Sequence, residues 1–96
     1  MTKTYILDFL KLHEVEMKEK YDVVKIGLFG SYARDNAHED SDIDLYAEFE
    51  NKKFRNIAGV WNYLEQQLGK KIDLFYDHKN MRDSLRKSIE NEVIYG

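Results

Sequence analysis

Two aspartates, Asp42 and Asp44, open an apolar run, and ten residues separate them from the preceding pair Gly30-Ser31. Side chains alternate along a strand, so both carboxylates are expected on one face while Ile43 points to the other. Two like charges held this close are costly unless a cation lies between them or one takes up a proton. Oxygen-only ligands favour Mg²⁺, with Mn²⁺ as the alternative, and Mg²⁺ usually completes its shell with water and substrate phosphates. The pair therefore predicts a metal-nucleotide site.

A third aspartate, Asp73, lies between two apolar residues in the stretch KIDLFY. If this stretch pairs beside the strand of Asp44, three carboxylates converge. That number suffices for two metal ions roughly 3.5–4 Å apart and an in-line displacement at phosphorus. Asp73 could then take the proton from an attacking hydroxyl. Gly30 lets the backbone approach a ligand, and exposed N–H groups at a helix start, with the Ser31 hydroxyl, can hold phosphate oxygens.

The elements that must position these residues follow from periodicity and breaks. The pattern predicts a single domain over 1–96 with the order α-β-α-β-α-β-α, and the fold class is α/β (α+β): a small mixed sheet of about three strands flanked by helices. The expected helices cover 3–19, a short segment from Ser31 to about Ala37, 54–68 and 80–94, and the expected strands are Val23–Phe29, Ile43–Phe49 and Lys71–Tyr76.

Composition narrows the possible functions. The net charge of −3, with scattered basic residues, disfavours stable binding to nucleic acid. The chain has no cysteine, and His13, His38 and His78 fall on separate predicted elements, so no zinc site is expected. His13 is expected at the edge of the core. No stretch reaches the roughly 18 apolar residues of a membrane span, so we expect no membrane association and a cytoplasmic location.

The motif Gly30-Ser31, ten residues, Asp42-Ile43-Asp44 and the later Asp73 resembles the signature of the DNA polymerase β-like nucleotidyltransferase superfamily. The stretches GSYARDNAHEDSDIDL and LRKSIENEVIYG look most like its minimal members, the antitoxins encoded beside HEPN-type ribonuclease toxins. The resemblance implies the polymerase β-like fold and Mg²⁺-dependent transfer of AMP from ATP. Asp42 and Asp44 would hold the metals, Asp73 would complete the triad, and Gly30 and Ser31 would hold the triphosphate. In these antitoxins the acceptor is a tyrosine hydroxyl of the toxin, and modification silences the toxin.

One position departs from the family pattern. The family often has Gly after the dipeptide that is Ala33-Arg34 here, whereas this chain has Asp35. A negative charge at this position would lie near the phosphates and bears on nucleotide affinity. Arg34 either contacts phosphate or pairs with a nearby carboxylate, for which the candidates are Asp35, Glu39 and Asp40.

Each signal has a plain structural explanation when taken singly. An Asp-x-Asp strand entry can be solvated, a Gly-Ser pair can cap a helix, and a strand aspartate can be exposed at an edge. Their combination favours an enzyme. Because 96 residues leave no room for an acceptor-binding domain, the acceptor must bring its own surface, and exposed apolar residues of the first or last helix are the candidate contact.

Three hypotheses follow. The first is an antitoxin that adenylylates a HEPN-type toxin and forms a hetero-oligomer with it. The second is a degenerate nucleotidyltransferase fold that neutralises its partner by binding alone. The third is a nucleotidyltransferase that modifies a small molecule.

Overall fold

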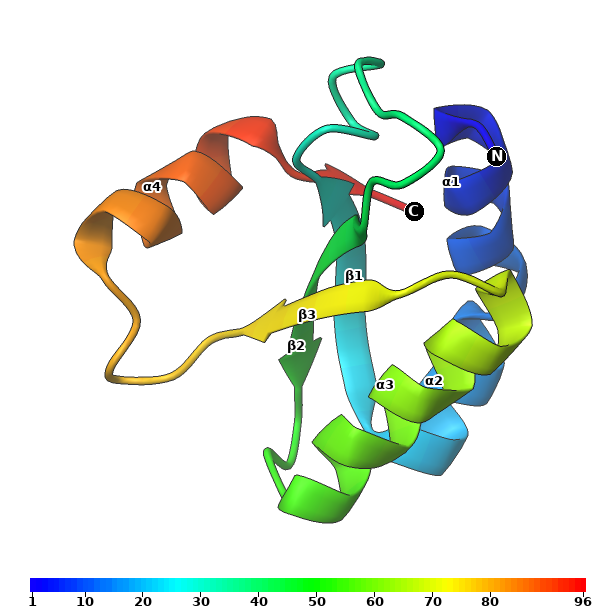
Figure 1. The fold of residues 1–96 in the computed structure, drawn as a ribbon. Coiled ribbons are helices and arrows are strands. Elements are labelled where there is room, and N and C mark those ends of the chain that lie inside the picture. Colours follow the sequence, from blue (N-terminus) through cyan, green and yellow to red (C-terminus); the bar gives the residue numbers. More distant parts are fainter.

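Four strands form one mixed sheet in the order β3-β2-β1-β4 in the computed structural model, which describes residues 1–96 (Figure 1). Strand β2 runs antiparallel to β1 and parallel to β3, and β4 runs antiparallel to β1. The strands are β1 (Val23–Phe29), β2 (Ile43–Phe49), β3 (Ile72–Tyr76) and β4 (Ile94–Tyr95). The α/β class with a mixed sheet is confirmed, and β4 is the strand that the prediction of about three strands missed.

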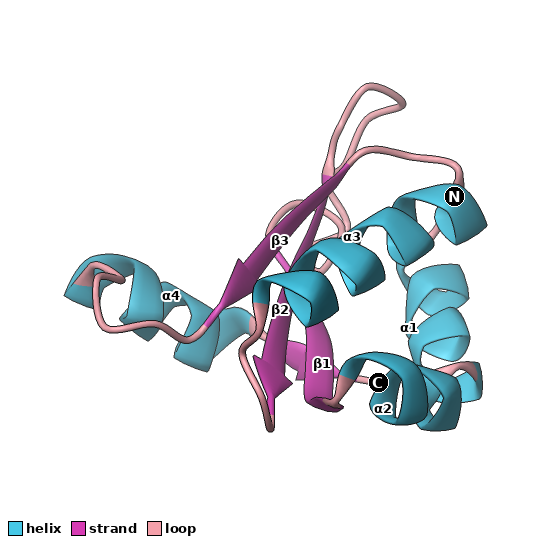
Figure 2. Ribbon diagram, turned by 90° about the horizontal axis from the view of Figure 1, so that it is seen from below, coloured by secondary structure: helices cyan, strands magenta, loops and turns pink.

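Three helices cover one face of the sheet and the last helix lies on the other (Figure 2). The helices are α1 (Lys3–Leu12), α2 (Glu14–Tyr21), α3 (Phe54–Leu68) and α4 (Asp83–Glu92). The main core lies between α1–α3 and the sheet, and alternating strand residues point into it. They include Leu28 from β1, Leu45 from β2 and Leu74 from β3. A smaller apolar cluster joins α4 to the opposite face through Phe29, Tyr46, Met81 and Ile89.

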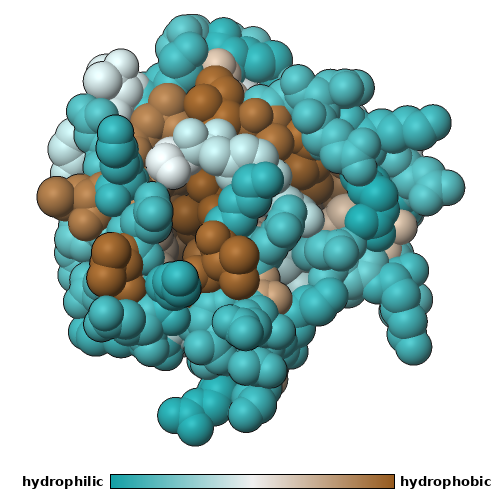
Figure 3. Space-filling model, turned by 180° about the vertical axis from the view of Figure 1, so that it is seen from behind, coloured by the Kyte–Doolittle hydropathy of each residue, from teal (hydrophilic) through white to brown (hydrophobic).

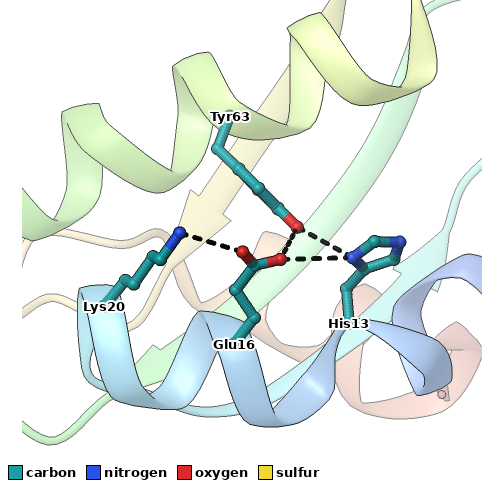
Figure 4. A network of polar contacts seen from close by, with 4 residues as sticks. All are labelled: His13, Glu16, Lys20 and Tyr63. Carbon is teal, nitrogen blue, oxygen red and sulfur yellow. Dashed lines mark hydrogen bonds and ion pairs between the residues drawn. The ribbon is translucent and has the colours of Figure 1, made fainter.

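The predicted helix over 3–19 is wrong in one respect, because the structure breaks it at His13 into α1 and α2. At the break, Tyr63 of α3 donates its hydroxyl hydrogen to Glu16 Oε1 at 2.5 Å and lies 2.8 Å from Nδ1 of His13 (Figure 4). Lys20 Nζ contacts the other Glu16 oxygen at 2.9 Å. These bonds, the one from Tyr63 foremost, lower the pKa of Glu16 to about 2. His13 is partly buried and packs against Phe9, which contacts the main core, so it lies at the core edge as predicted.

Helix α3 has the predicted bounds, and Gly69 ends it at φ 67°, a left-handed conformation that glycine adopts at low cost. Helix α4 is shorter than the predicted 80–94. It ends because Val93 is extended, with φ −68° and ψ 135°, and leads directly into β4.

The short helix predicted from Ser31 to about Ala37 is wrong, since the structure has only a single turn there. Asp35 adopts a left-handed conformation at φ 59°. Its N–H donates to the carbonyl of Tyr32 at 3.3 Å, and the N–H of Asn36 donates to the carbonyl of Ser31 at 3.0 Å. This pair of bonds is the Schellman motif that terminates helices, and its left-handed position is the one where glycine is most common.

Candidate active site

Asp44 and Asp73 are direct partners in the parallel pairing of β2 with β3. Their strand neighbours Ile43, Leu45 and Ile72 are buried in the main core, so both carboxylates lie on the opposite face of the sheet, the face that carries α4. The register thus provides the pairing that the sequence prediction required of Asp73.

Gly30 follows β1 and lies in contact with the Asp44 carboxylate. A Cβ atom built on Gly30 would come within 2.1 Å of Asp44 Oδ2 and 2.9 Å of its Cγ. Gly30 also has φ 77°, a region that residues with a Cβ avoid. Both the lack of space and the backbone conformation therefore require glycine at this position. The contact places the turn after β1 directly beside the carboxylate of Asp44.

The charges around Asp44 show which groups share this edge of the sheet. Burial raises the pKa of Asp44 to about 6, and the negative charges of Asp73 and Asp42 add to the rise. The positive charge of Arg34 acts in the opposite direction. Asp42, Asp73 and Arg34 are therefore close enough to Asp44 to act on it electrostatically.

The donor set suits a hard cation that brings further ligands with it. No three acidic or histidine side chains are arranged so that they could hold a metal ion by themselves. Mg²⁺, however, commonly uses one or two protein carboxylates and takes its other ligands from water and phosphates. Carboxylate oxygens whose mutual repulsion a cation would relieve fit such an open site. Lys71 also lies beside the group, with Nζ 3.8 Å from Asp42 Oδ2.

The turn after β1 presents free backbone donors. The N–H groups of Ser31, Tyr32 and Ala33 have no backbone acceptor, because the first bond of the turn runs from the N–H of Arg34 to the carbonyl of Gly30, at 3.1 Å. Such unpaired N–H groups at the start of a helical turn are suited to binding anions. The turn retains this property although it does not continue into a helix.

Arg34 pairs with a residue that was not among its predicted partners. Its Nη1 contacts Glu92 Oε1 at 2.5 Å, and Glu92 is the last residue of α4. Asp35 is held elsewhere, because its Oδ2 lies 3.2 Å from Nζ of Lys3 in α1. The acidic side chain that replaces the usual glycine is thus directed to α1, while Arg34 is tied to the C-terminal end of the chain.

Sequence reasoning missed Glu92 and Lys71 as neighbours of the site. Glu92 is 58 residues from Arg34 along the chain, and nothing local signals their contact. Lys71 could have been found, because it immediately precedes the strand that carries Asp73 and must lie near any carboxylate at the start of the neighbouring strand.

Exposed apolar side chains are found on the first helices but not on α4. Leu12, Val15 and Tyr5 are 80, 64 and 54% exposed, whereas α4 has no comparably exposed large apolar residue. Seen from the side opposite to Figure 1, apolar side chains form groups interrupted by hydrophilic ones (Figure 3). None of the helices is both long and apolar enough to cross a bilayer.

Comparison with known families gives a match to the nucleotidyltransferase domain over residues 10–95. The chain is 34% identical over 96 residues to the protein adenylyltransferase MntA of Thermococcus cleftensis, a match that covers 99% of this chain and 96% of the relative. It is 38% identical to the protein MJ1379 of Methanocaldococcus jannaschii, with 98% and 97% of the two chains covered.

Solved structures share the fold. A minimal nucleotidyltransferase superposes with a TM-score of 0.80 at 27% identity, covering 98% of this chain and 95% of the other. A toxin-antitoxin complex with AMP-PNP gives a TM-score of 0.70 at 18% identity, with 88% and 70% covered. A complex of tri-AMPylated Shewanella oneidensis HEPN toxin with MNT antitoxin gives a TM-score of 0.63 at 15% identity, with 93% and 70% covered. The last two show a common fold only.

Proposed function

Because the chain belongs to the nucleotidyltransferase domain family, we propose that it is a protein adenylyltransferase that transfers AMP from ATP to a tyrosine of a cognate HEPN-type toxin and thereby neutralises the toxin. The observation that carries the proposal is the direct pairing of Asp44 with Asp73 beside Gly30. The name of the T. cleftensis relative and the toxin-antitoxin complexes that share the fold support the choice of a protein acceptor.

In this proposal separate groups of residues bind the triphosphate and the metal. The free N–H groups from Ser31 onward and the Ser31 hydroxyl bind the triphosphate. Arg34 lies at the same edge of the sheet and contributes a positive charge toward it. Asp42, Asp44 and Asp73 would hold Mg²⁺ together with water and the phosphate oxygens of ATP, and the metal would neutralise charge at the phosphates.

The transfer itself exchanges one bond at phosphorus for another. The acceptor tyrosine oxygen forms a bond to the α-phosphorus of ATP, and the bond from that phosphorus to the bridging oxygen of pyrophosphate breaks. The hydroxyl proton passes to the carboxylate of Asp73, which lies in the strand next to Asp44. The acceptor is held by its own protein's surface, for which the exposed apolar residues of α1 and α2 are the candidate contact on this chain. Because Asp44 and Asp73 lie on the opposite face of the sheet, the acceptor segment that carries the tyrosine has to extend from this contact to the α4 face.

The test is the intact mass of the purified toxin after incubation with this protein, ATP and Mg²⁺. We expect mass increases in steps of one AMP and loss of toxin ribonuclease activity. The double variant D42N/D44N should remain folded and leave the toxin mass unchanged. Neutralisation without a mass change would instead support an antitoxin that acts by binding alone, and transfer to a small molecule but to no protein would contradict the proposed acceptor.

A further inference from the structure

Helix α3 covers the outer edge of strand β3 with two side chains. Trp61 Nε1 donates to the carbonyl oxygen of Ile72 at 2.7 Å, and the N–H of Ile72 donates to Glu65 Oε2 at 3.0 Å. Trp61 and Glu65 are four residues apart and so lie on one face of the helix. Strand β3 is at the edge of the sheet and has β2 as its only neighbouring strand. The two side chains therefore provide hydrogen-bond partners for the N–H and the carbonyl of Ile72, as a further strand would.

The two hydrogen bonds to Ile72 matter for the site because Ile72 immediately precedes Asp73. The carbonyl bonded by Trp61 belongs to the peptide group that Ile72 shares with Asp73. On the inner side the strand start is held by β2, where the N–H of Ile43 donates to the carbonyl of Lys71 at 3.1 Å. The backbone that carries Asp73 is thus fixed from both sides.

An edge strand at this position needs such support because of the charges it carries. Asp44 and Asp73 face one another across the β2–β3 pairing, and their repulsion acts to separate the two strands. Strand β3 is only five residues long, so few ladder hydrogen bonds oppose that repulsion.

We propose that Trp61 and Glu65 are positioning residues, which hold the start of β3 against the repulsion between Asp44 and Asp73 and so keep Asp73 opposite Asp44. The catalytic consequence rests on the proposed AMP transfer, whereas the structural part does not. Trp61 is partly buried and packs against the main core, and its indole N–H is used at the strand edge.

The test uses variants that remove one hydrogen bond each. W61F keeps an aromatic ring but loses the donor, E65A loses the acceptor, and E65Q keeps a carbonyl oxygen that can still accept. Q66A changes an exposed neighbour on the same helix and serves as the matched control. Amide hydrogen exchange reads the strand edge directly, without ATP, metal or toxin.

We expect E65A to accelerate exchange of the Ile72 amide by about tenfold, and W61F to do the same for the Asp73 amide. E65Q and Q66A should stay close to the wild type. In a D73N background the repulsion is absent, so E65A should accelerate exchange by a clearly smaller factor. In the transfer assay, W61F and E65A should lower kcat by about tenfold with the KM for ATP unchanged, and E65Q should restore it.

Unchanged exchange at Ile72 and Asp73 in both variants would overturn the inference, as would an equal acceleration by E65A with and without D73N. Faster amide exchange together with a wild-type kcat would show that Trp61 and Glu65 do not position Asp73 for transfer. If the wild-type protein transfers no AMP at all, the proposed function fails, and the exchange measurements still decide whether Trp61 and Glu65 hold the strand.

Discussion

The Asp44 carboxylate lies against the α-carbon of Gly30, so closely that a methyl group on Gly30 would come within 2.1 Å of Asp44 Oδ2. This contact joins the turn after β1 to the carboxylates on β2 and β3. It also explains why the motif needs glycine before the serine, because any side chain at this position would displace the Asp44 carboxylate.

Replacing Gly30 by alanine should therefore abolish AMP transfer while the protein still folds. The left-handed backbone at φ 77° costs alanine about 1 kcal/mol, and moving the Asp44 carboxylate disrupts the site in addition. Urea unfolding would measure the first effect, and the mass of the modified toxin would measure the second.

Gly69→Ala is the matched control. Gly69 has a similar φ of 67° but no atom within 4 Å of its missing Cβ. The G69A variant should lose about 1 kcal/mol in free energy of unfolding and keep full transfer activity. Equal activity of the two variants would contradict the role assigned to the Gly30 contact.

Asp44→Asn should stabilise the metal-free protein at neutral pH. Burial and the neighbouring aspartates raise the pKa of Asp44 from 3.8 to about 6, so its folded state favours the protonated form. The stability that this shift contributes is complete below pH 4 and is lost as the pH rises through 6. Because Asp44 is partly exposed, the gain of the variant at pH 7 should be about 1 kcal/mol.

Urea unfolding in the presence of a chelator, at pH 4 and pH 7, would test this expectation. The difference between the variant and the wild type should grow between the two pH values. Asp40→Asn, which changes an exposed loop aspartate, should show no such growth. A gain that is the same at both pH values would contradict the argument.

Asp35→Gly should leave stability nearly unchanged, whereas Asp35→Ala should destabilise the protein by about 1 kcal/mol. Asp35 occupies the left-handed position of the Schellman motif, which glycine tolerates and alanine does not. Both variants lose the exposed ion pair with Lys3, which is worth less than about 1 kcal/mol. Since that pair directs the carboxylate to α1, neither variant should change the KM for ATP by more than about twofold.

Glu16→Gln should destabilise the protein at pH 7, and the loss should shrink as the pH falls from 4.5 to 2. Hydrogen bonds from Tyr63, Lys20 and His13 lower the pKa of Glu16 to about 2, so the stability it provides is present above its ordinary value of 4.5 and is lost on acidification. Urea midpoints across this range would test the expectation. Glu19→Gln, an exposed change on the same helix, should show no pH-dependent difference.

The parts of the fold that local signals specify could be predicted from the sequence. Helix α3 has an apolar stripe and a terminal glycine, and its bounds were predicted correctly. The alternation in β2 and β3 places Asp44 and Asp73 on one face, and only their relative register required the structure.

Long-range contacts could not be predicted in the same way. Strand β4 has two residues and forms because Gly27 has no side chain: a Cβ there would come within 2.5 Å of Val93 Cγ2 and 2.9 Å of the carbonyl oxygen of Ile94. At the break between α1 and α2, His13 contacts Tyr63 in α3, and the partner of Arg34 lies in α4. Each of these features joins segments whose local sequence carries no sign of the other.

The pairing of β4 with β1 also joins two segments that are far apart in the sequence, because Gly27 pairs with Tyr95 and Leu28 with Ile94. Closing so long a loop costs conformational entropy, and β4 has only two residues to offset that cost. We therefore expect β4 to be the first strand of the sheet to detach in local unfolding. Its detachment would free the end of α4 that holds Arg34 through Glu92, while the carboxylates of Asp44 and Asp73 would stay paired on β2 and β3.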